Sequence, residues 1–138
     1  MTRAELLSFL RGHRYAVQAT VGAHGPQAAT VGFAVADDLQ FVFDTLGTSR
    51  KFHNLQRSPA IALVISDDHH TAQIEGVARQ LLGPELDWAL PVYDRAFPDG
   101  PSRRAWPDLV YVGVQPTWIR YSDFVTDRIV ERPFEQWS

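Results

Sequence analysis

Short β-prone segments that follow one another at close spacing constrain the fold of this chain more than any other feature. Residues 15–21 and 27–36 are joined by turn residues at 22–26, which predicts a hairpin, and residues 39–44 add a third strand. Further β-prone segments lie at 60–66, 71–82, 109–114 and 117–121. About six or seven strands with few helices predict a mainly β fold, an antiparallel barrel.

Capping residues, glycines and prolines predict three helices and one corner within this pattern of strands. Thr2 and Glu5 have the spacing of a capping box, so a short helix opens the chain and ends at Gly12. A second helix, capped by Thr48 or Ser49, runs to about residue 57, and a third begins at Pro84, with Pro91 leaving its continuation to 97 open. Residues 98–104 are expected to be an irregular loop, Gly76 a bulge or barrel corner, and Pro116 a kink between two strands.

Composition excludes several classes of function. The 138 residues include no cysteine, which rules out disulfides, zinc ribbons, iron–sulfur clusters and a thiol nucleophile. A net charge of −3 argues against nucleic-acid binding, and no apolar run approaches the ~20 residues of a membrane span. Without a linker, a repeat or a signal-peptide pattern, we expect one cytoplasmic domain over residues 1–138.

The segment from Asp44 to Phe52 is the most informative for function. Arg50 and Lys51, the only lysine of the chain, stand at the start of a predicted helix, where a positive helix end disfavours cations. An anion held by these two cations, the hydroxyls of Thr48 and Ser49 and free backbone N–H groups would resolve the conflict, and phosphate fits best. The alternative reading is that both side chains extend into solvent.

This segment and its surroundings resemble the pyridoxamine 5′-phosphate oxidase-like flavoproteins, the FMN-binding split-barrel family. The similar stretches are Phe43 to Lys51, the strand from Arg14 to Thr20, the turn Gly25-Pro26-Gln27-Ala28, and Gln73-Ile74-Glu75-Gly76 on the long strand. They occur in the family's order over roughly residues 5 to 121. The resemblance implies a homodimer of six-stranded antiparallel split barrels with FMN in clefts between the protomers.

The resemblance also implies roles for individual residues. Arg50 and Lys51 would hold the FMN phosphate with the hydroxyls of Thr48 and Ser49. Asp44 and Thr45 would lie near the ribityl chain or the ring. The backbone of Ala29, Thr30, Val31 and Gly32 would face the isoalloxazine ring.

Two departures from the family pattern argue against oxidation of pyridoxamine phosphate itself. Thr71 stands where such oxidases carry a glutamine, and the C-terminal residues 133–138 do not match the region that supplies basic residues for the substrate phosphate. A branch of the same barrel that binds a deazaflavin remains an alternative.

Other candidates carry weaker signals. His69 and His70 lack ligand partners at metal spacing, so no metal site is expected, and His53 is interpreted as a helix-surface residue. Trp106, Trp118 and Tyr121 could stack on a flavin from the partner subunit or belong to a core or interface. No G-x-S-x-G motif supports a hydrolase, and no catalytic residue is identified.

The sequence therefore predicts an FMN-dependent oxidoreductase that acts on an unidentified small molecule and uses an unidentified electron donor. No membrane or nucleic-acid partner is expected. The alternatives are a deazaflavin-dependent reductase and a non-catalytic module that binds flavin or haem.

Overall fold

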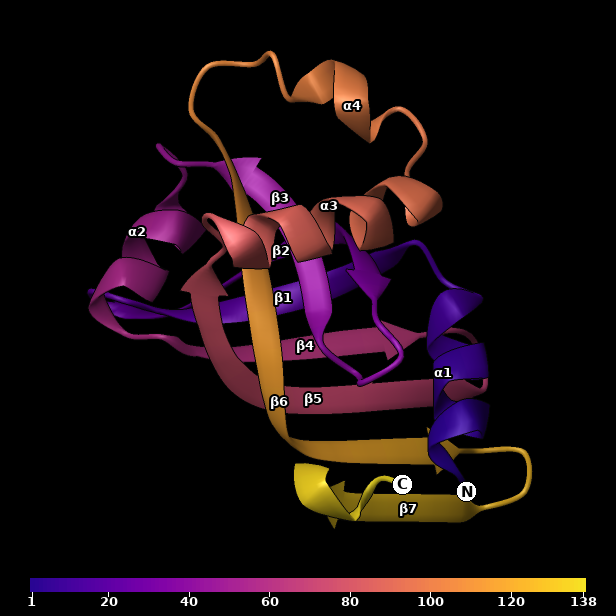
Figure 1. Ribbon diagram of the computed structural model, residues 1–138. Helices are drawn as coiled ribbons and strands as arrows, with labels where there is room; N and C mark the ends of the chain where they lie inside the picture. Colours follow the sequence, from indigo (N-terminus) through magenta and orange to yellow (C-terminus); the bar gives the residue numbers. More distant parts are fainter.

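The computed structural model describes all 138 residues, and six of its seven strands close into an antiparallel barrel (Figure 1). Hydrogen-bonded neighbours follow the order β3-β2-β1-β4-β5-β6, and a further pairing of β3 with β6 joins the ends of this series. The strands are β1 (Tyr15–Gly22), β2 (Gly25–Val35), β3 (Phe41–Leu46), β4 (Ala60–Ser66), β5 (His70–Gln80), β6 (Leu109–Asp123) and β7 (Arg128–Pro133). The expected six-stranded antiparallel split barrel is confirmed, with β7 added outside it.

Strand β6 is shared by the barrel and the added strand. Its residues 112–123 pair with β5, while residues 109–114 pair with β3 and residues 118–123 with β7. The register between β5 and β6 shifts between Glu75 and Gly76, which confirms the predicted bulge, and the ribbon of β6 turns a corner (Figure 1). A methyl group on Gly76 would lie 2.6 Å from the carbonyl oxygen of Gln115, so this close approach requires glycine.

Helices cover the barrel at its ends and on one outer face. They are α1 (Arg3–Arg11), α2 (Arg50–Arg57), α3 (Pro84–Ala96), α4 (Gly100–Arg103) and the 3₁₀ helix η1 (Phe134–Gln136). The capping box at α1 is confirmed, because the Thr2 hydroxyl accepts from the backbone N–H of Glu5 and the Glu5 carboxylate accepts from that of Thr2. Of the two candidate caps for α2, Ser49 is the one that caps the helix.

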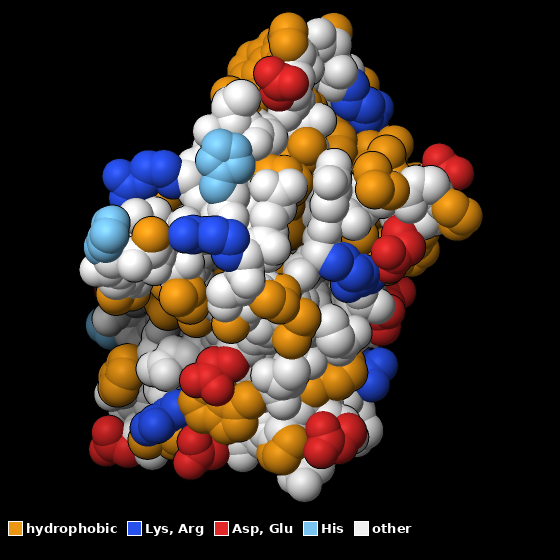
Figure 2. Space-filling view, turned by 90° about the vertical axis from the view of Figure 1, so that its left-hand side faces the viewer, with side chains coloured by type: hydrophobic (Ala, Val, Ile, Leu, Met, Phe, Trp, Pro, Cys, Tyr) orange, Lys and Arg blue, Asp and Glu red, His pale blue; other side chains and the backbone are white.

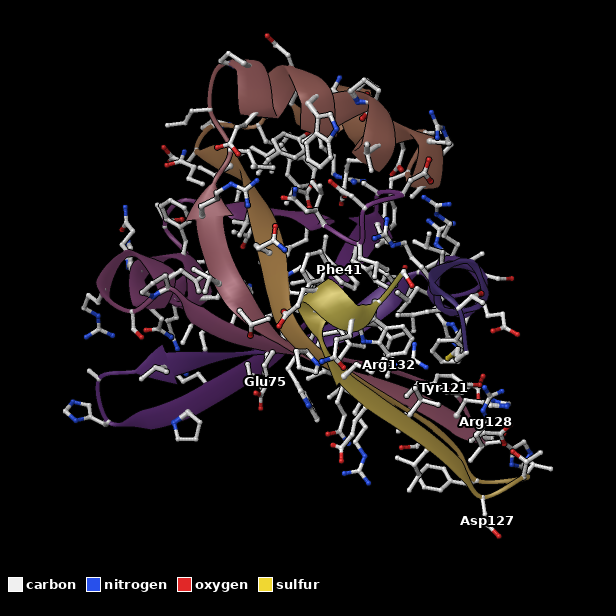
Figure 3. All side chains as sticks on the ribbon, turned by 60° about the horizontal axis from the view of Figure 1, so that its bottom comes forward. Phe41, Glu75, Tyr121, Asp127, Arg128 and Arg132 are labelled. Atoms are coloured by element: carbon white, nitrogen blue, oxygen red, sulfur yellow. The ribbon has the colours of Figure 1, made fainter.

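Apolar side chains form two separate cores. The larger core fills the barrel, where alternate residues point inward: Figure 3 shows Phe41, fully buried, inside the structure, and Glu75 pointing away from the barrel. The smaller core lies between the outer face of β2 and β3 and helix α3, which contributes Tyr93 and Ala89. Burial of apolar area in both cores supplies the main driving force for this arrangement.

Four features of local structure differ from the expectation or were left open by it. Helix α3 continues through Pro91 to Ala96, because packing of Tyr93 against the sheet outweighs the backbone bond that proline cannot make. The expected loop at 98–104 contains the short helix α4, and the two strands expected around Pro116 form one bent strand, β6. Strand β7 was not expected, since its partner β6 and not its own sequence holds it in place.

The two ends of the chain lie together beside β7 (Figure 1). The backbone N–H of Arg3 donates to the carbonyl of Ser138 at 3.0 Å, and the Arg132 guanidinium donates to the carbonyl of Met1 at 2.8 Å. None of the helices has the length and the apolar character that crossing a membrane requires.

Candidate functional site

The end of β3 and the start of α2 bring hydroxyl groups and a lysine together. The Thr45 hydroxyl donates to the Ser49 hydroxyl at 3.1 Å, and the Lys51 ammonium donates to the Thr45 hydroxyl at 3.4 Å. Ser49 in turn accepts from the backbone N–H of Phe52 at 3.3 Å, which fixes its side chain as the helix cap. The structure thus gathers three of the predicted site residues into one polar cluster.

Arg50 extends from the same helix turn toward β2. Its Nε donates to the Gln27 amide oxygen at 3.2 Å, and the same oxygen accepts from the Asn54 amide at 2.8 Å. Asn54 is buried and also donates to the Thr20 hydroxyl at 3.1 Å. This polar network therefore tethers Arg50. The sequence analysis missed it because its members come from three separate elements.

The electrostatics of this helix start favour an anion. The first turn of α2 has no acidic residue, while Arg50 and Lys51 add two positive charges to the positive end of the helix dipole. Figure 2 looks onto the side of the molecule that carries α2. Basic and histidine side chains lie in its upper left, where no acidic side chain is visible, and other basic side chains are spread over the rest of this face. Hydroxyls, cations and free N–H groups are the donors that bind phosphate, so these residues fit the phosphate of FMN.

A pocket of about 310 Å³ opens beside the cluster. Its lining comes from the predicted segment and from the chain between α4 and the start of β6, namely Asp44, Thr45, Leu46, Thr48, Ser49, Lys51, Arg103, Trp106 and Leu109. The sequence analysis named Trp106 as an aromatic residue either of a partner's flavin contact or of a core or interface, and it did not name Arg103 as a site residue. No local signal marks Arg103, which reaches the pocket only because α4 folds back over β3.

Arg103 forms the centre of a charged group at the pocket wall. Its guanidinium lies 3.4 Å from the Asp44 carboxylate, 2.7 Å from that of Asp99 and 3.4 Å from the Tyr93 hydroxyl. Burial, together with the nearby Asp44 carboxylate, raises the pKa of Tyr93 far above its ordinary value, so its phenol stays protonated. The Arg103 guanidinium thus holds the Asp44 carboxylate in an ion pair at the pocket wall.

The predicted ring-binding segment of β2 lies next to the tethered Gln27. Ala29 and Thr30 are exposed, whereas the side chain of Val31 is buried in the barrel and leaves only its backbone for a ligand. Gly32 lies under helix α3, where an added methyl group would be 2.7 Å from the Phe97 ring. Cofactor contacts of these four residues, and of the cluster at α2, stay predictions.

The other residues singled out in the sequence lie away from this pocket. His53 is exposed on α2. Trp118 and Tyr121 lie on the part of β6 that pairs with β7, and the Tyr121 ring packs edge-on against Phe9 at 5.2 Å.

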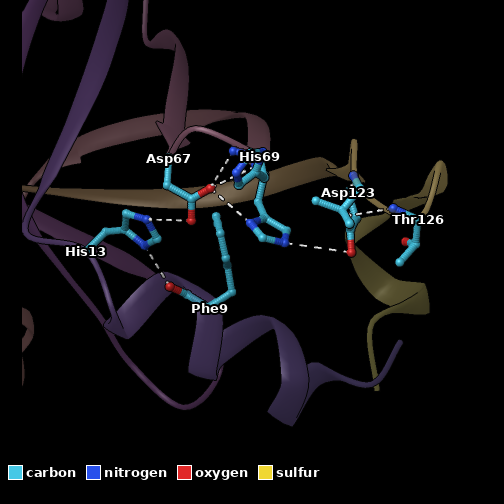
Figure 4. Close-up of polar contacts among 8 residues, drawn as sticks. Phe9, His13, Asp67, His69, Asp123 and Thr126 are labelled. Atoms are coloured by element: carbon cyan, nitrogen blue, oxygen red, sulfur yellow. Dashed lines mark hydrogen bonds and ion pairs between the residues drawn. The ribbon is translucent and has the colours of Figure 1, made fainter.

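Histidines and aspartates alternate at the opposite end of the barrel (Figure 4). Asp67 contacts His13 at 3.5 Å and His70 at 2.9 Å, and the other nitrogen of His70 lies 3.7 Å from Asp123. Hydrogen bonds from the His69 backbone and from the His70 ring lower the pKa of Asp67 to about 2. The structure groups no three histidine, aspartate or glutamate side chains in a way that could hold a metal ion.

The barrel topology defines a split barrel of antiparallel strands, and the start of α2 gives it a cationic helix end without an acidic residue. The chain belongs to the pyridoxamine 5′-phosphate oxidase family, whose model matches residues 2–123.

Comparison with individual proteins agrees with this assignment. Over 65 residues the chain is 34% identical to 5a,11a-dehydrotetracycline/5a,11a-dehydrooxytetracycline reductase of Streptomyces rimosus, a match that covers 44% of this chain and 46% of the reductase. A haem-binding protein from Mycobacterium smegmatis superimposes with a TM-score of 0.85 at 17% identity, over 98% of this chain and 59% of that one. A Clostridium acetobutylicum protein related to general stress protein 26, of the pyridoxinephosphate oxidase family, gives a TM-score of 0.78 at 15% identity, covering 99% of this chain and 96% of that one.

Proposed function

We propose that residues 1–138 form a single FMN-binding domain that works as an FMN-dependent oxidoreductase. Its substrate is a small molecule, and a separate electron donor reduces the flavin. The observation that carries this proposal is the start of α2, where two cations and two hydroxyl side chains surround free N–H groups with no acidic residue in the turn.

Each residue of the site has a proposed task. Arg50, Lys51, Ser49 and Thr48 bind the phosphate, and Gln27 holds the Arg50 guanidinium at the edge of β2. Thr45 and Asp44 face the ribityl chain, and the backbone of residues 29–32 faces the ring. Bound FMN supplies hydride and electron transfer, while the protein binds and orients it, which is consistent with a site that lacks an obvious acid–base pair.

The proposed assembly is a homodimer with the cofactor at the interface. On the outer face of the sheet, Val17 (46% exposed) pairs in register with Val64 (39% exposed) on one side and with Thr30 on the other. Val77 on β5 and Val21 on β1 are also exposed. An apolar sheet face beside the proposed ring site suits a partner subunit that would complete the cleft. Sedimentation that shows only monomer would refute this part of the proposal.

Cofactor titration of variants tests the phosphate site. Replacing Lys51 or Arg50 with alanine removes a charge-assisted hydrogen bond of about 1.5–3 kcal/mol, so FMN affinity should fall roughly 10- to 150-fold. Arg128→Ala, which removes an equal charge from β7, is the matched control and should leave the affinity unchanged. Equal FMN affinity in all three variants and the wild type, measured by flavin fluorescence quenching, would refute the phosphate assignment.

Two other cofactors provide the alternatives. Similarity to a reductase supports reduction as the reaction class, and a deazaflavin could serve as the hydride donor in place of FMN. The haem-binding structural neighbour supports a non-catalytic haem or flavin module. Parallel titration of the protein with FMN, a deazaflavin and haem separates these possibilities, because the FMN proposal requires that FMN bind most tightly and that bound flavin be reduced by a nicotinamide nucleotide.

A further inference from the structure

A second and larger pocket, of about 670 Å³, lies between α1, the end of β2 and α3. Its lining residues are Leu10, Arg11, His13, Phe33, Ala34, Val35, Ala36, Asp37, Asp38, Trp88, Val92, Arg95 and Ala96. None of them lines the pocket beside the phosphate segment. Its volume falls within the range of about 300–1,000 Å³ that is usual for small-molecule sites.

Most of the residues that line the pocket are apolar. Eight of its thirteen lining residues are hydrophobic, among them the buried Phe33 and Leu10. Helix α3 presents one stripe to the pocket, since Trp88, Val92 and Ala96 follow at four-residue intervals. The Trp88 indole is 40% exposed, so a large aromatic surface is available to a ligand at the pocket wall.

The charged groups of the pocket are two guanidinium groups and two carboxylates. The Arg11 guanidinium donates to the Asp37 carboxylate at 2.7 Å and to the carbonyl of Val35 at 3.0 Å. The hydrogen bond from Arg11 and, to a smaller extent, the charge of Arg95 lower the pKa of Asp37, so this carboxylate remains ionised. Asp38 accepts from the backbone N–H of Gln40 at 3.1 Å. Arg95 is exposed and forms no ion pair, so only one of the two guanidinium groups is paired with a carboxylate.

The histidine of this pocket is also engaged. One ring nitrogen of His13 lies 2.9 Å from the carbonyl oxygen of Phe9, and the other lies 3.5 Å from the Asp67 carboxylate. In total the lining carries Arg11 and Arg95 against Asp37 and Asp38, whereas the start of α2 has two cations and no acidic residue.

We infer that this pocket binds an uncharged, flat molecule with fused or linked aromatic rings and discriminates against phosphorylated or otherwise anionic ones. The apolar floor and the Trp88 indole supply contact area for the rings. An anionic group would be repelled by Asp37 and Asp38, and because Arg11 is already paired with Asp37 at the exposed rim, the lining as a whole offers no net positive charge. The idea that such a molecule is the substrate rests on the proposed function. The inference that the pocket binds such a molecule is independent of the proposed function.

A matched pair of fluorescent probes tests this inference. N-phenyl-1-naphthylamine is uncharged, and 8-anilinonaphthalene-1-sulfonate has the same ring skeleton with one negative charge. Titration of the protein, prepared without flavin, should show at least tenfold tighter binding of the uncharged probe. Pyridoxal 5′-phosphate, added as a competitor, should not displace it. Equal or tighter binding of the sulfonate would overturn the inference.

Variants locate the probe and separate this site from the cofactor site. Trp88→Ala should weaken binding of the uncharged probe about tenfold, the effect expected for an aromatic contact, whereas Trp106→Ala at the other pocket should not change it. Filling the pocket with Ala96→Phe should abolish binding while the circular dichroism and the melting temperature stay near those of the wild type. Asp37→Asn should bring the affinities for the two probes closer together.

Lys51→Ala distinguishes the two proposals. It should weaken FMN binding and leave probe binding unchanged. Loss of the probe in Lys51→Ala, or binding that withstands both Trp88→Ala and Ala96→Phe, would place the probe elsewhere and overturn the inference. A protein that binds the uncharged probe at Trp88 but does not bind FMN would refute the proposed function and uphold the pocket.

Discussion

Replacing Asn54 with alanine should destabilise the protein although the residue belongs to no apolar core. Its amide donates to Thr20 at 3.1 Å and to Gln27 at 2.8 Å, and its oxygen accepts from Arg57 at 3.0 Å. The side chain is 4% exposed and the Thr20 hydroxyl that it satisfies belongs to a residue that is 3% exposed. Alanine therefore leaves buried polar groups without partners.

The magnitude follows from these three bonds. At about 1 kcal/mol each they contribute roughly 3 kcal/mol, and the Arg57 bond counts for less because its donor is exposed. Alanine also favours a helix interior over asparagine by about 0.5 kcal/mol. The net loss in the free energy of unfolding should be about 2 kcal/mol, which lowers the melting temperature of a chain of this size by about 8 °C.

Urea and thermal unfolding, followed by circular dichroism at one protein concentration, measure this loss. Gln56→Ala, an exposed change on the same helix, is the control and should alter the free energy of unfolding by less than about 0.5 kcal/mol. A cycle with Thr20→Val should give a coupling energy of at least about 0.5 kcal/mol. If Asn54→Ala were as neutral as Gln56→Ala, the network could not be what holds α2 against β1 and β2.

Three further predictions concern the corner of the barrel and two titrating groups. Gly76→Ala should cost roughly 1–3 kcal/mol in unfolding experiments because its methyl group would overlap a carbonyl oxygen, whereas Gly47→Ala, with no atom nearer than 3.4 Å, should be close to neutral. The fold lowers the pKa of Asp67 from 3.8 to about 2, so the contribution of this carboxylate to stability is complete above pH 4 and is lost as the pH falls toward 2. The melting temperature of Asp67→Asn should therefore lack this dependence on acid pH. An acid profile equal to that of the wild type would contradict this prediction. Burial and then the Asp44 carboxylate raise the pKa of Tyr93, so stability should decline as the pH rises above about 10, and Tyr93→Phe should remove one phenol that ionises only when the protein unfolds.

Local signals predicted those elements whose determinants lie close together in the sequence. The capping box of Thr2 and Glu5 and the boundaries of β4 at Ala60–Ser66 agree with the structure. Gly76 marked the bulge because a strand interior rarely tolerates glycine without a geometric reason. Helix α3 was only half predicted, since Pro91 is a local obstacle and the packing that overrides it involves distant strands.

The candidate site was also predicted only where its residues lie close together in the sequence. Residues 44–51 are contiguous, so their charge and hydroxyl pattern could be interpreted directly, and three of them do form a cluster. Arg103, Gln27 and Asn54 reach the site from separate elements. The sequence next to each of them contains no feature that indicates this position. Only the closed barrel brings these segments together.

Because β6 closes the barrel by pairing with both β3 and β5, its late position in the sequence affects how the chain folds. Barrel closure joins residues 41–46 to 109–114, so it waits until most of the chain has been synthesised. Before that point β3 and β5 both present unpaired backbone groups, and such edges readily add strands from other molecules. The nascent chain is therefore most exposed to aggregation just before β6 emerges. Once inserted, β6 is hydrogen-bonded on both sides over residues 112–114 and 118–123, and the amide protons of these residues should be among the last to exchange with solvent.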